Sequence, residues 1–199
     1  SADWLDAVAN ARALVEAGRI LIGPGAAGEP DADLGARVLV VGGGDNAFDV
    51  THHLVGTGRH VTIASRAATH AQPVLAERVR ADIAQGRAAI RSGVSVKAVA
   101  EGPAGIAVRF DDGSALDVDR IVLCLGYVPN TGAPWIDALG LVRDPHGYLP
   151  VDRNMETSCA GVFAVGDVSN PHHPCVATAL GAGTMAAREI LKRHAGLPD

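Results

Sequence analysis

The sequence predicts an α/β fold in which strands of a parallel sheet alternate with helices and a small antiparallel meander is inserted. Two observations predict it. Between residues 37 and 86, short β-branched runs alternate with helix-like segments that end at glycine. Between residues 94 and 119, the apolar period changes from 3.6 to 2, which is typical of antiparallel strands. This order of elements is that of an α/β arrangement with an insert.

The first half of the chain is predicted from local patterns. Apolar residues recur at helical spacing through 3–17, and the run RVLVV at 37–41 is typical of a strand buried on both faces. Glycines close the next helix, and Pro73 lies near the first turn of the one after it. The expected elements are a helix at 3–17, a strand at 20–22, a strand at 37–41, a helix at 45–58, a strand at 60–64 and a helix at 72–86.

The second half begins with the meander. Residues 94–101 and 105–119 alternate as antiparallel strands, and Asp112-Gly113 supplies turn chemistry between two of them. The apolar run at 120–126 indicates a return to the parallel sheet. A proline-punctuated stretch then leads to a short strand at 162–166 and a final helix from about 177 to 194.

Composition excludes several classes of partner. The 199 residues suffice for one large domain or two small ones, and the net charge of −5 argues against nucleic acid or an anionic membrane as partner. No apolar run reaches the roughly 20 residues of a membrane span. We see no basic and then apolar pattern of a signal peptide near Ser1. Three widely spaced cysteines, without a C-x-x-C motif, predict a reducing cytoplasm.

A glycine-rich stretch between the strand at 37–41 and the following helix carries the first chemical signal. Gly42, Gly44 and Ala47 form G-x-G-x-x-A. The first glycine permits a tight turn, the second lets the backbone approach a pyrophosphate, and Ala47 permits close packing of helix on strand. The helix start at Asp45 and Asn46 offers N–H donors and a partial positive charge to phosphates. The pattern favours dinucleotide binding over a purely structural turn.

The end of the second strand bears on the choice of cofactor. NAD sites usually carry Asp or Glu there, whereas NADP sites carry an arginine for the 2′-phosphate. Here Ser65 and Arg66 stand at that position without an acid, which favours NADP. The alternative is a solvated surface arginine, and NAD stays possible.

Three segments together resemble the pyridine nucleotide-disulfide oxidoreductase family, and most of all its thioredoxin reductase branch. They are VVGGGDNAFD, IVLCLGYVPNT and METSCAGVFAVGDVSN, and the last is followed by VATALGAGTMAA. The resemblance extends from residue 18 to about 195. It implies an enzyme, an NAD(P)H-dependent flavin oxidoreductase that passes hydride from nicotinamide to FAD and on to an unidentified acceptor. It also implies a Rossmann-like NAD(P)-binding domain with a β-meander insert, plus the C-terminal part of a second, FAD-type fold.

The resemblance also implies domain limits and site residues. Residues 1–34 would be a remnant of the FAD-type domain, 35–125 the NAD(P)-binding domain and 126–199 the C-terminal part of the FAD-type domain. The expected cofactor-binding residues toward NAD(P) are Gly42, Gly44, Asp45, Asn46 and Ala47 at the pyrophosphate, Ser65 and Arg66 at the adenosine ribose, and Gly126 near the nicotinamide half. Those expected toward FAD are Gly166, Asp167 and Val176.

The sequence departs from the family pattern in four ways. No strand–GxGxxG–helix precedes Gly42, so the chain is either a fragment of a longer flavoprotein or a true short form. No C-x-x-C precedes the glycine loop, which excludes dithiol exchange by that route. Pro174-Cys175 replaces the family's Arg-Gln near the flavin. Arg66 alone remains of several arginines, so NADH stays possible.

Alternatives follow from these departures. The chain could be a non-catalytic NAD(P)-binding or regulatory domain that has lost FAD, or, with less support, a plain dehydrogenase. His172, His173 and Cys175 supply too few ligands for a metal, so no metal is expected. The expected partners are a small-molecule or electron-carrier acceptor and, by resemblance, a second copy in a homodimer.

Overall fold

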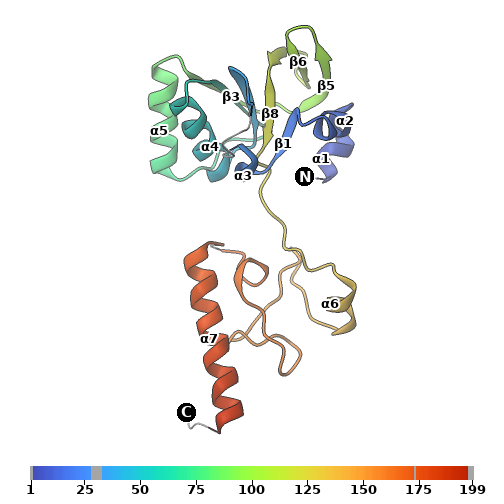
Figure 1. The fold of residues 1–199 in the computed structure, drawn as a ribbon, viewed down its shortest axis with the longest axis vertical. Coiled ribbons are helices and arrows are strands. Elements are labelled where there is room, and N and C mark those ends of the chain that lie inside the picture. Colours follow the sequence, from blue (N-terminus) through green and yellow to red (C-terminus); the bar gives the residue numbers. More distant parts are fainter. Residues whose placement is uncertain (1, 28–32, 173, 197–199) are drawn as a thin grey trace. The chain divides into compact units, whose positions relative to one another are not determined.

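The computed structural model describes residues 2–27, 33–172 and 174–196. The chain divides into two compact units, Ser1–Gly126 and Tyr127–Asp199 (Figure 1). Within the described ranges, no helix combines the length and the apolar character that crossing a membrane requires.

A five-stranded parallel sheet forms the centre of the first unit. Its strand order is β1-β8-β2-β3-β4, and every neighbouring pair is parallel. The strands are β1 (Ile20–Ile22), β8 (Arg120–Leu123), β2 (Arg37–Val41), β3 (His60–Ser65) and β4 (Ala88–Ser92). The strand β1 lies in the segment 1–34, which the resemblance assigns to the FAD-type domain, and it pairs with β8 in this sheet.

Both faces of the sheet are covered, which explains the apolar run of β2. Val38 and Val40 belong to the core on one face, with residues of α4 (Asp45–Gly56) and α5 (Pro73–Ala84). Leu39 and Val41 belong to the core on the other face, with residues of the antiparallel sheet and of α2 (Ala11–Glu16). Successive side chains of a strand point to opposite faces, so a strand covered on both sides is apolar throughout.

The antiparallel sheet has the order β5-β6-β7. Its strands are β5 (Val96–Gly102), β6 (Gly105–Phe110) and β7 (Ala115–Val118). Gly113, at φ 83°, makes the predicted turn between β6 and β7. The parallel sheet and this separate meander confirm the α/β fold class.

The predicted helix at 3–17 is wrong in one respect, because it is broken. The structure has α1 (Ala2–Ala7) and α2, and between them Asn10 adopts φ 65°. Ala9 pairs with Ala98 of β5 through backbone bonds to Lys97 and Val99, and the side-chain amide of Asn10 donates to the carbonyl of Val99 at 3.0 Å. Backbone bonds to β5 thus replace helical ones, and asparagine tolerates the left-handed conformation that this requires. The apolar side chains of both helices still pack on the predicted side.

Sequence analysis missed three short elements: β4, α3 (Pro24–Ala27) and α6 (Pro134–Ala138). The side chains of β4 are half-buried or exposed, as suits an edge strand. Its run AAIRS therefore lacks the clear alternation from which a strand is predicted.

The second unit contains α6, the 3-10 turn η1 (Gly166–Val168) and α7 (Val176–Ala195). The predicted strand at 162–166 is wrong: only Phe163 pairs, in a single bridge to Glu156. A strand needs a neighbouring strand, and residues 127–172 and 174–196 contain none. The core of this unit is small, formed by Ile136, Leu141, Leu149 and Ala164.

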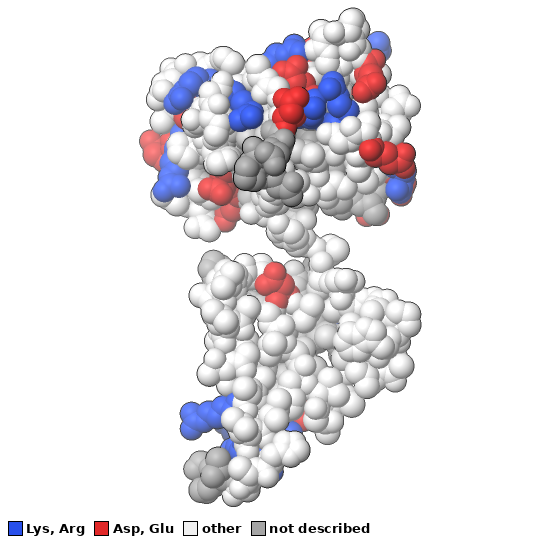
Figure 2. Space-filling view, viewed as in Figure 1, with Lys and Arg blue, Asp and Glu red and all other residues white. Residues whose placement is uncertain are grey.

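The helix α7 is the longest of the described helices, and Ala186 is its one buried residue. Val176, Leu180 and Leu191 are 76%, 68% and 64% exposed. On the face drawn in Figure 2, charged side chains gather on the first unit and are sparse on the second. The second unit therefore presents an apolar surface along much of α7.

Arg193 fixes the end of α7 to the rest of its unit. Its guanidinium donates to both carboxylate oxygens of Glu156, at 2.7 and 2.6 Å, and to Glu189 at 2.7 Å. The ring centre of Phe163 lies 5.4 Å from the guanidinium carbon. The hydrogen bonds from Arg193, and then that from the Gly161 N–H, lower the pKa of Glu156 from 4.5 to about 2.

We expect Arg193→Met to make the second unit more sensitive to acid. A carboxyl whose pKa is depressed in the folded state stabilises the fold above its ordinary pKa, and this contribution is lost as the pH falls toward 2. Without Arg193 the pKa of Glu156 returns toward 4.5, so the midpoint of acid unfolding should rise by about one pH unit. Far-ultraviolet circular dichroism of the chain against pH, to which α7 contributes as the longest described helix, measures this. Arg188→Met, which removes an exposed charge from the same helix, is the control, and equal midpoints would contradict the expectation.

Candidate functional site

The turn after β2 shows why glycine stands at position 42. Gly42 adopts φ 147°, and its N–H donates to the carbonyl of Ala64 at 2.9 Å. A Cβ atom added there would overlap the backbone carbonyl of Cys124, which follows β8. Because the turn lies between the ends of β3 and β8, only glycine fits.

The helix α4 begins directly after this turn. Gly44 is its N-cap, in extended conformation at φ −99°, and the carbonyl of Gly44 accepts the N–H of Ala47 at 3.0 Å. No side chain caps the helix. Ala47 is completely buried, which allows the close packing of helix on sheet that the glycine motif predicts. The start of α4, with Asp45 and Asn46, therefore lies at the end of the sheet where β2 finishes.

The loop between β3 and α5, residues 66–72, is tied to the glycine turn. The N–H of His70 donates to the carbonyl of Gly43 at 2.8 Å. The carboxylate of Asp45 accepts the backbone N–H and the side-chain amide of Gln72, both at 2.7 Å. The predicted pyrophosphate residue Asp45 therefore uses its carboxylate to position this loop, while its backbone belongs to the helix start.

Ser65 and Arg66 lie where β3 ends. Ser65 is buried, and its hydroxyl donates to the carbonyl of Ala67. Arg66 is exposed. Cys124, whose carbonyl lies against Gly42, is a buried thiol. Burial raises its pKa to about 12, so the thiol stays protonated and inert at neutral pH.

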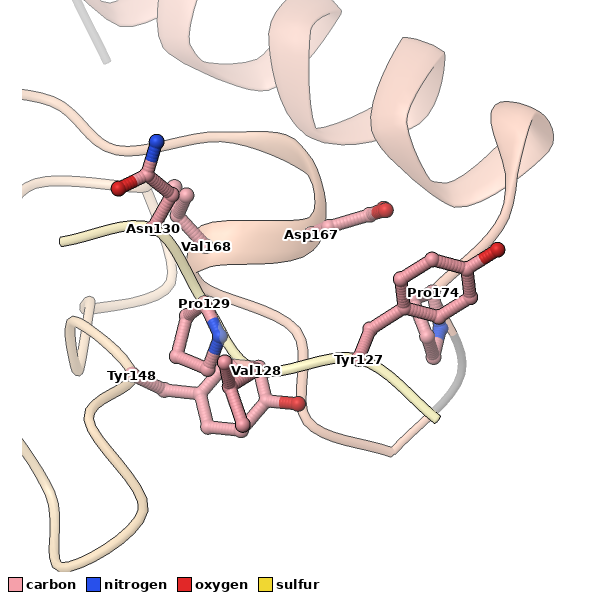
Figure 3. A pocket seen from close by; sticks show the side chains of 8 residues that line it. All are labelled: Tyr127, Val128, Pro129, Asn130, Tyr148, Asp167, Val168 and Pro174. Carbon is pink, nitrogen blue, oxygen red and sulfur yellow. The ribbon is translucent and has the colours of Figure 1, made fainter. Parts of the chain in front are cut away.

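The residues expected at FAD lie around η1 and the start of α7. Gly166 adopts φ 79°, and a Cβ added there would lie 3.7 Å from that of Ala179 on α7. Figure 3 shows the carboxylate of Asp167 extending from η1. Val176 is the first residue of α7, and 76% of it is exposed. Together these residues place an exposed carboxylate beside an exposed helix start.

A pocket of about 210 Å³ lies next to this carboxylate within the second unit (Figure 3). Two aromatic side chains, an amide and the carboxylate give it a mixed character. Its lining residues are Tyr127, Val128, Pro129, Asn130, Tyr148, Asp167, Val168 and Pro174. It has the size of a subsite and not of a complete cofactor site, which typically occupies about 300–1,000 Å³.

Cys175 caps α7 in a reciprocal arrangement with Thr178. Its N–H donates to the hydroxyl of Thr178 at 3.3 Å, and the sulfur lies 3.5 Å from the same oxygen. The hydroxyl of Thr178, and then its backbone N–H, lower the pKa of the Cys175 thiol, while the charge of Asp167 opposes this shift. The thiol is thus a structural cap with raised acidity.

The structure brings the predicted residues together in two groups. Gly42, Gly44, Asp45, Asn46, Ala47, Ser65 and Arg66 meet at the carboxyl ends of β2 and β3. Gly166, Asp167 and Val176 meet at the start of α7, and Gly126, at φ 81°, is the last residue of the first unit. Their roles toward the cofactors stay predictions.

Sequence reasoning missed His70 and Gln72, both of which contact the glycine turn or the helix start. Their only signal was their place between strand and helix. Among the residues that the structure describes, no three His, Cys, Asp or Glu side chains converge as they would on a metal ion. His173, which we considered in this context, lies outside the described residues.

Comparison with known proteins finds one family over most of the chain. The family described as pyridine nucleotide-disulphide oxidoreductase matches residues 8–186. A glutathione reductase of Burkholderia cepacia is 30% identical over 137 residues, which are 67% of this chain and 30% of that protein. A ferredoxin–NADP reductase of Ignicoccus hospitalis is 33% identical over 170 residues, which are 81% of this chain and 54% of that protein.

A solved structure shows the same fold. Thioredoxin reductase of Lactococcus lactis superposes with a TM-score of 0.72 at 24% identity, over 93% of this chain and 60% of that chain. The chain thus spans about half or less of the length of the two relatives named above.

Proposed function

The chain belongs to the pyridine nucleotide-disulphide oxidoreductase family, and from this premise we propose that it acts as an NAD(P)H-dependent flavin oxidoreductase, or as part of one. One observation supports the nicotinamide half of this proposal most directly. Gly42 lies so close to the carbonyl of Cys124 that no side chain fits, and the glycine turn opens onto the uncapped start of α4. This is the arrangement by which parallel α/β sheets bind the pyrophosphate of a dinucleotide.

In this proposal, different residues of the chain have different roles in binding the dinucleotide. Backbone N–H groups at the start of α4 bind the linked phosphates, and Ala47 holds the helix close to the sheet. Asp45 positions the 66–72 loop through Gln72. Arg66 is the residue that we assign to the adenosine ribose, where its guanidinium would distinguish NADPH from NADH.

The second unit fits part of a flavin site. Asp167 offers an exposed carboxylate that can accept hydrogen bonds from ribityl hydroxyls, and Gly166 leaves room at the backbone. At the start of α7, Val176 is exposed, and the N–H of Thr178 is already bound by the Cys175 cap. Bound nicotinamide would supply a hydride and FAD would accept it, and the residues named above would contribute binding and orientation.

The acceptor would be a small molecule or an electron carrier. No C-x-x-C occurs in the sequence, which separates this chain from dithiol chemistry of the thioredoxin reductase type. Three free cysteines fit a reducing compartment, and we include the cytoplasm and a homodimer in the proposal.

The test is a titration of the full chain with NADPH, NADH and FAD. Association with a nicotinamide cofactor and a flavin absorbance that survives gel filtration would support the proposal. A chain that binds NAD(P)H and stays colourless would favour the alternative, an NAD(P)-binding or regulatory domain without FAD. Pro174-Cys175, in place of the family's Arg-Gln near the flavin, supports that alternative. No association with either nicotinamide cofactor at millimolar concentration would contradict both.

We expect Arg66→Ala to weaken NADPH binding about tenfold and to leave NADH binding unchanged, because only NADPH carries a 2′-phosphate. Titration of both cofactors measures this. Arg109→Ala removes an equally exposed arginine from β6 and is the matched control. An equal effect of Arg66→Ala on the two cofactors would contradict a contact with the 2′-phosphate.

A further inference from the structure

We propose that His70 is a further cofactor-binding residue, which donates a hydrogen bond from Nε2 to the pyrophosphate of the dinucleotide. The inference rests on the proposed function, and it assigns a phosphate contact to a side chain outside the glycine motif.

The position of the imidazole carries the inference. A Cβ atom added at Gly44 would lie 3.0 Å from Nε2 of His70. The second glycine of the motif is the one whose missing side chain lets a pyrophosphate approach the backbone. The ring nitrogen of His70 therefore lies beside Gly44 in the place that a side chain at position 44 would take.

The loop holds His70 at this position from both sides. Its own N–H donates to the carbonyl of Gly43 at 2.8 Å, so the loop backbone is fixed to the glycine turn. Two residues later, Gln72 gives two hydrogen bonds to Asp45 at the helix start. Because α4 and the glycine turn hold the backbone on either side of His70, the side chain stays near Gly44.

The chemistry of the site favours a donor at this place. Asp45 brings a carboxylate to the start of α4, where the phosphates would add further negative charge. Arg66 is the one arginine in the segment between β3 and α5. Histidine can supply an N–H donor in the neutral form and a charge-assisted one when protonated. A dinucleotide diphosphate is the ligand that matches this arrangement.

Comparison of two variants separates this contact from that of Arg66. The pyrophosphate is common to NADH and NADPH, whereas the 2′-phosphate is present in NADPH alone. We therefore expect His70→Ala to weaken the binding of both cofactors by the same factor, about five- to tenfold. Arg66→Ala should change the NADPH affinity alone. His70→Gln, which keeps an N–H donor, should lose less affinity than His70→Ala.

The experiment is calorimetric titration of the full chain with NADH, NADPH and ADP, together with thermal unfolding of each variant without ligand. ADP carries the two linked phosphates without nicotinamide and should lose affinity in parallel. His60→Ala is the matched control, because His60 is exposed at the opposite end of the same strand, β3. Unchanged unfolding temperatures together with a parallel loss for the three ligands would support the inference.

Several outcomes would overturn it. Parent-like binding by His70→Ala, tighter binding, or a loss for NADPH alone would each exclude a pyrophosphate contact. Should His70→Ala lower the unfolding temperature, His70→Gln decides: a loss as large as that of the alanine variant would exclude the donor role. A parent that binds neither cofactor would contradict the proposed function itself, and a parent that binds while His70→Ala is unaffected would contradict only the role of His70.

Discussion

Gly42→Ala is expected to destabilise the first unit by about 3 kcal/mol or more, since backbone strain and overpacking each cost about 1–3 kcal/mol. The alanine would have to adopt φ 147°, and its Cβ would overlap the carbonyl oxygen of Cys124. Cys124 cannot move away freely. The N–H of Cys124 donates to Val41 at 2.8 Å, and Val122 and Leu123 just before it are buried. Binding of NADH and NADPH should be lost together with stability.

Urea unfolding of the full chain measures the effect. Trp4 packs against the core of the first unit and is one of two tryptophans in the sequence, so a Trp135→Phe background makes its fluorescence specific for this unit. Gly56→Ala is the matched control. It lies at the end of α4, where an added Cβ meets nothing within 4 Å and φ is not left-handed. If both variants unfolded at the same urea concentration, the close approach of the turn to β8 would be refuted.

Asp119→Ala is expected to cost about 2–3 kcal/mol at neutral pH, because a carboxylate with several charge-assisted bonds is lost. Its Oδ2 accepts the backbone N–H groups of Ala36 and Arg37, both at 2.8 Å, and its Oδ1 accepts from the Arg37 guanidinium at 2.7 Å. The side chain is 25% exposed, so solvent screens these bonds only in part. They join the start of β2 to the residue that precedes β8.

The same carboxyl predicts an acid dependence. The hydrogen bond from Arg37 is the main cause that lowers the pKa of Asp119 from 3.8 to about 2, against the opposing effect of burial. Its stabilising contribution is therefore complete above pH 4 and is lost as the pH falls toward 2. In the Trp135→Phe background, the parent should lose stability over this range more steeply than Asp119→Ala. Asp117→Ala, an exposed carboxyl on β7, should keep the parent's slope, and a parallel slope for Asp119→Ala would disprove the assignment.

Local patterns sufficed to predict β2, α4, β3 and α5 of the first unit. The run RVLVV is apolar because β2 is covered on both faces, and the turn that follows it requires glycine at position 42. The motif itself lies within residues 37–47, so the sequence displays it directly, although the carbonyl that Gly42 approaches belongs to the distant Cys124. The uncapped start of α4 follows from the same stretch.

Features that depend on distant contacts could not be predicted. The break at Asn10 depends on Val99, and the place of β1 beside β8 joins residues a hundred positions apart. The role of the Asp45 carboxylate depends on Gln72, whose position is fixed only when the loop has folded back. The strand at 162–166 was predicted from its composition, but composition does not reveal whether a partner strand is present.

The break between α1 and α2 places one residue against the open edge of β5. An open strand edge exposes N–H and C=O groups on which strands of other molecules can assemble. Ala9 occupies that edge of β5, since its N–H donates to Lys97 at 3.3 Å and its carbonyl accepts from Val99 at 3.1 Å. The segment that interrupts the helix thereby occupies part of the β5 edge, where a strand of another molecule could otherwise pair.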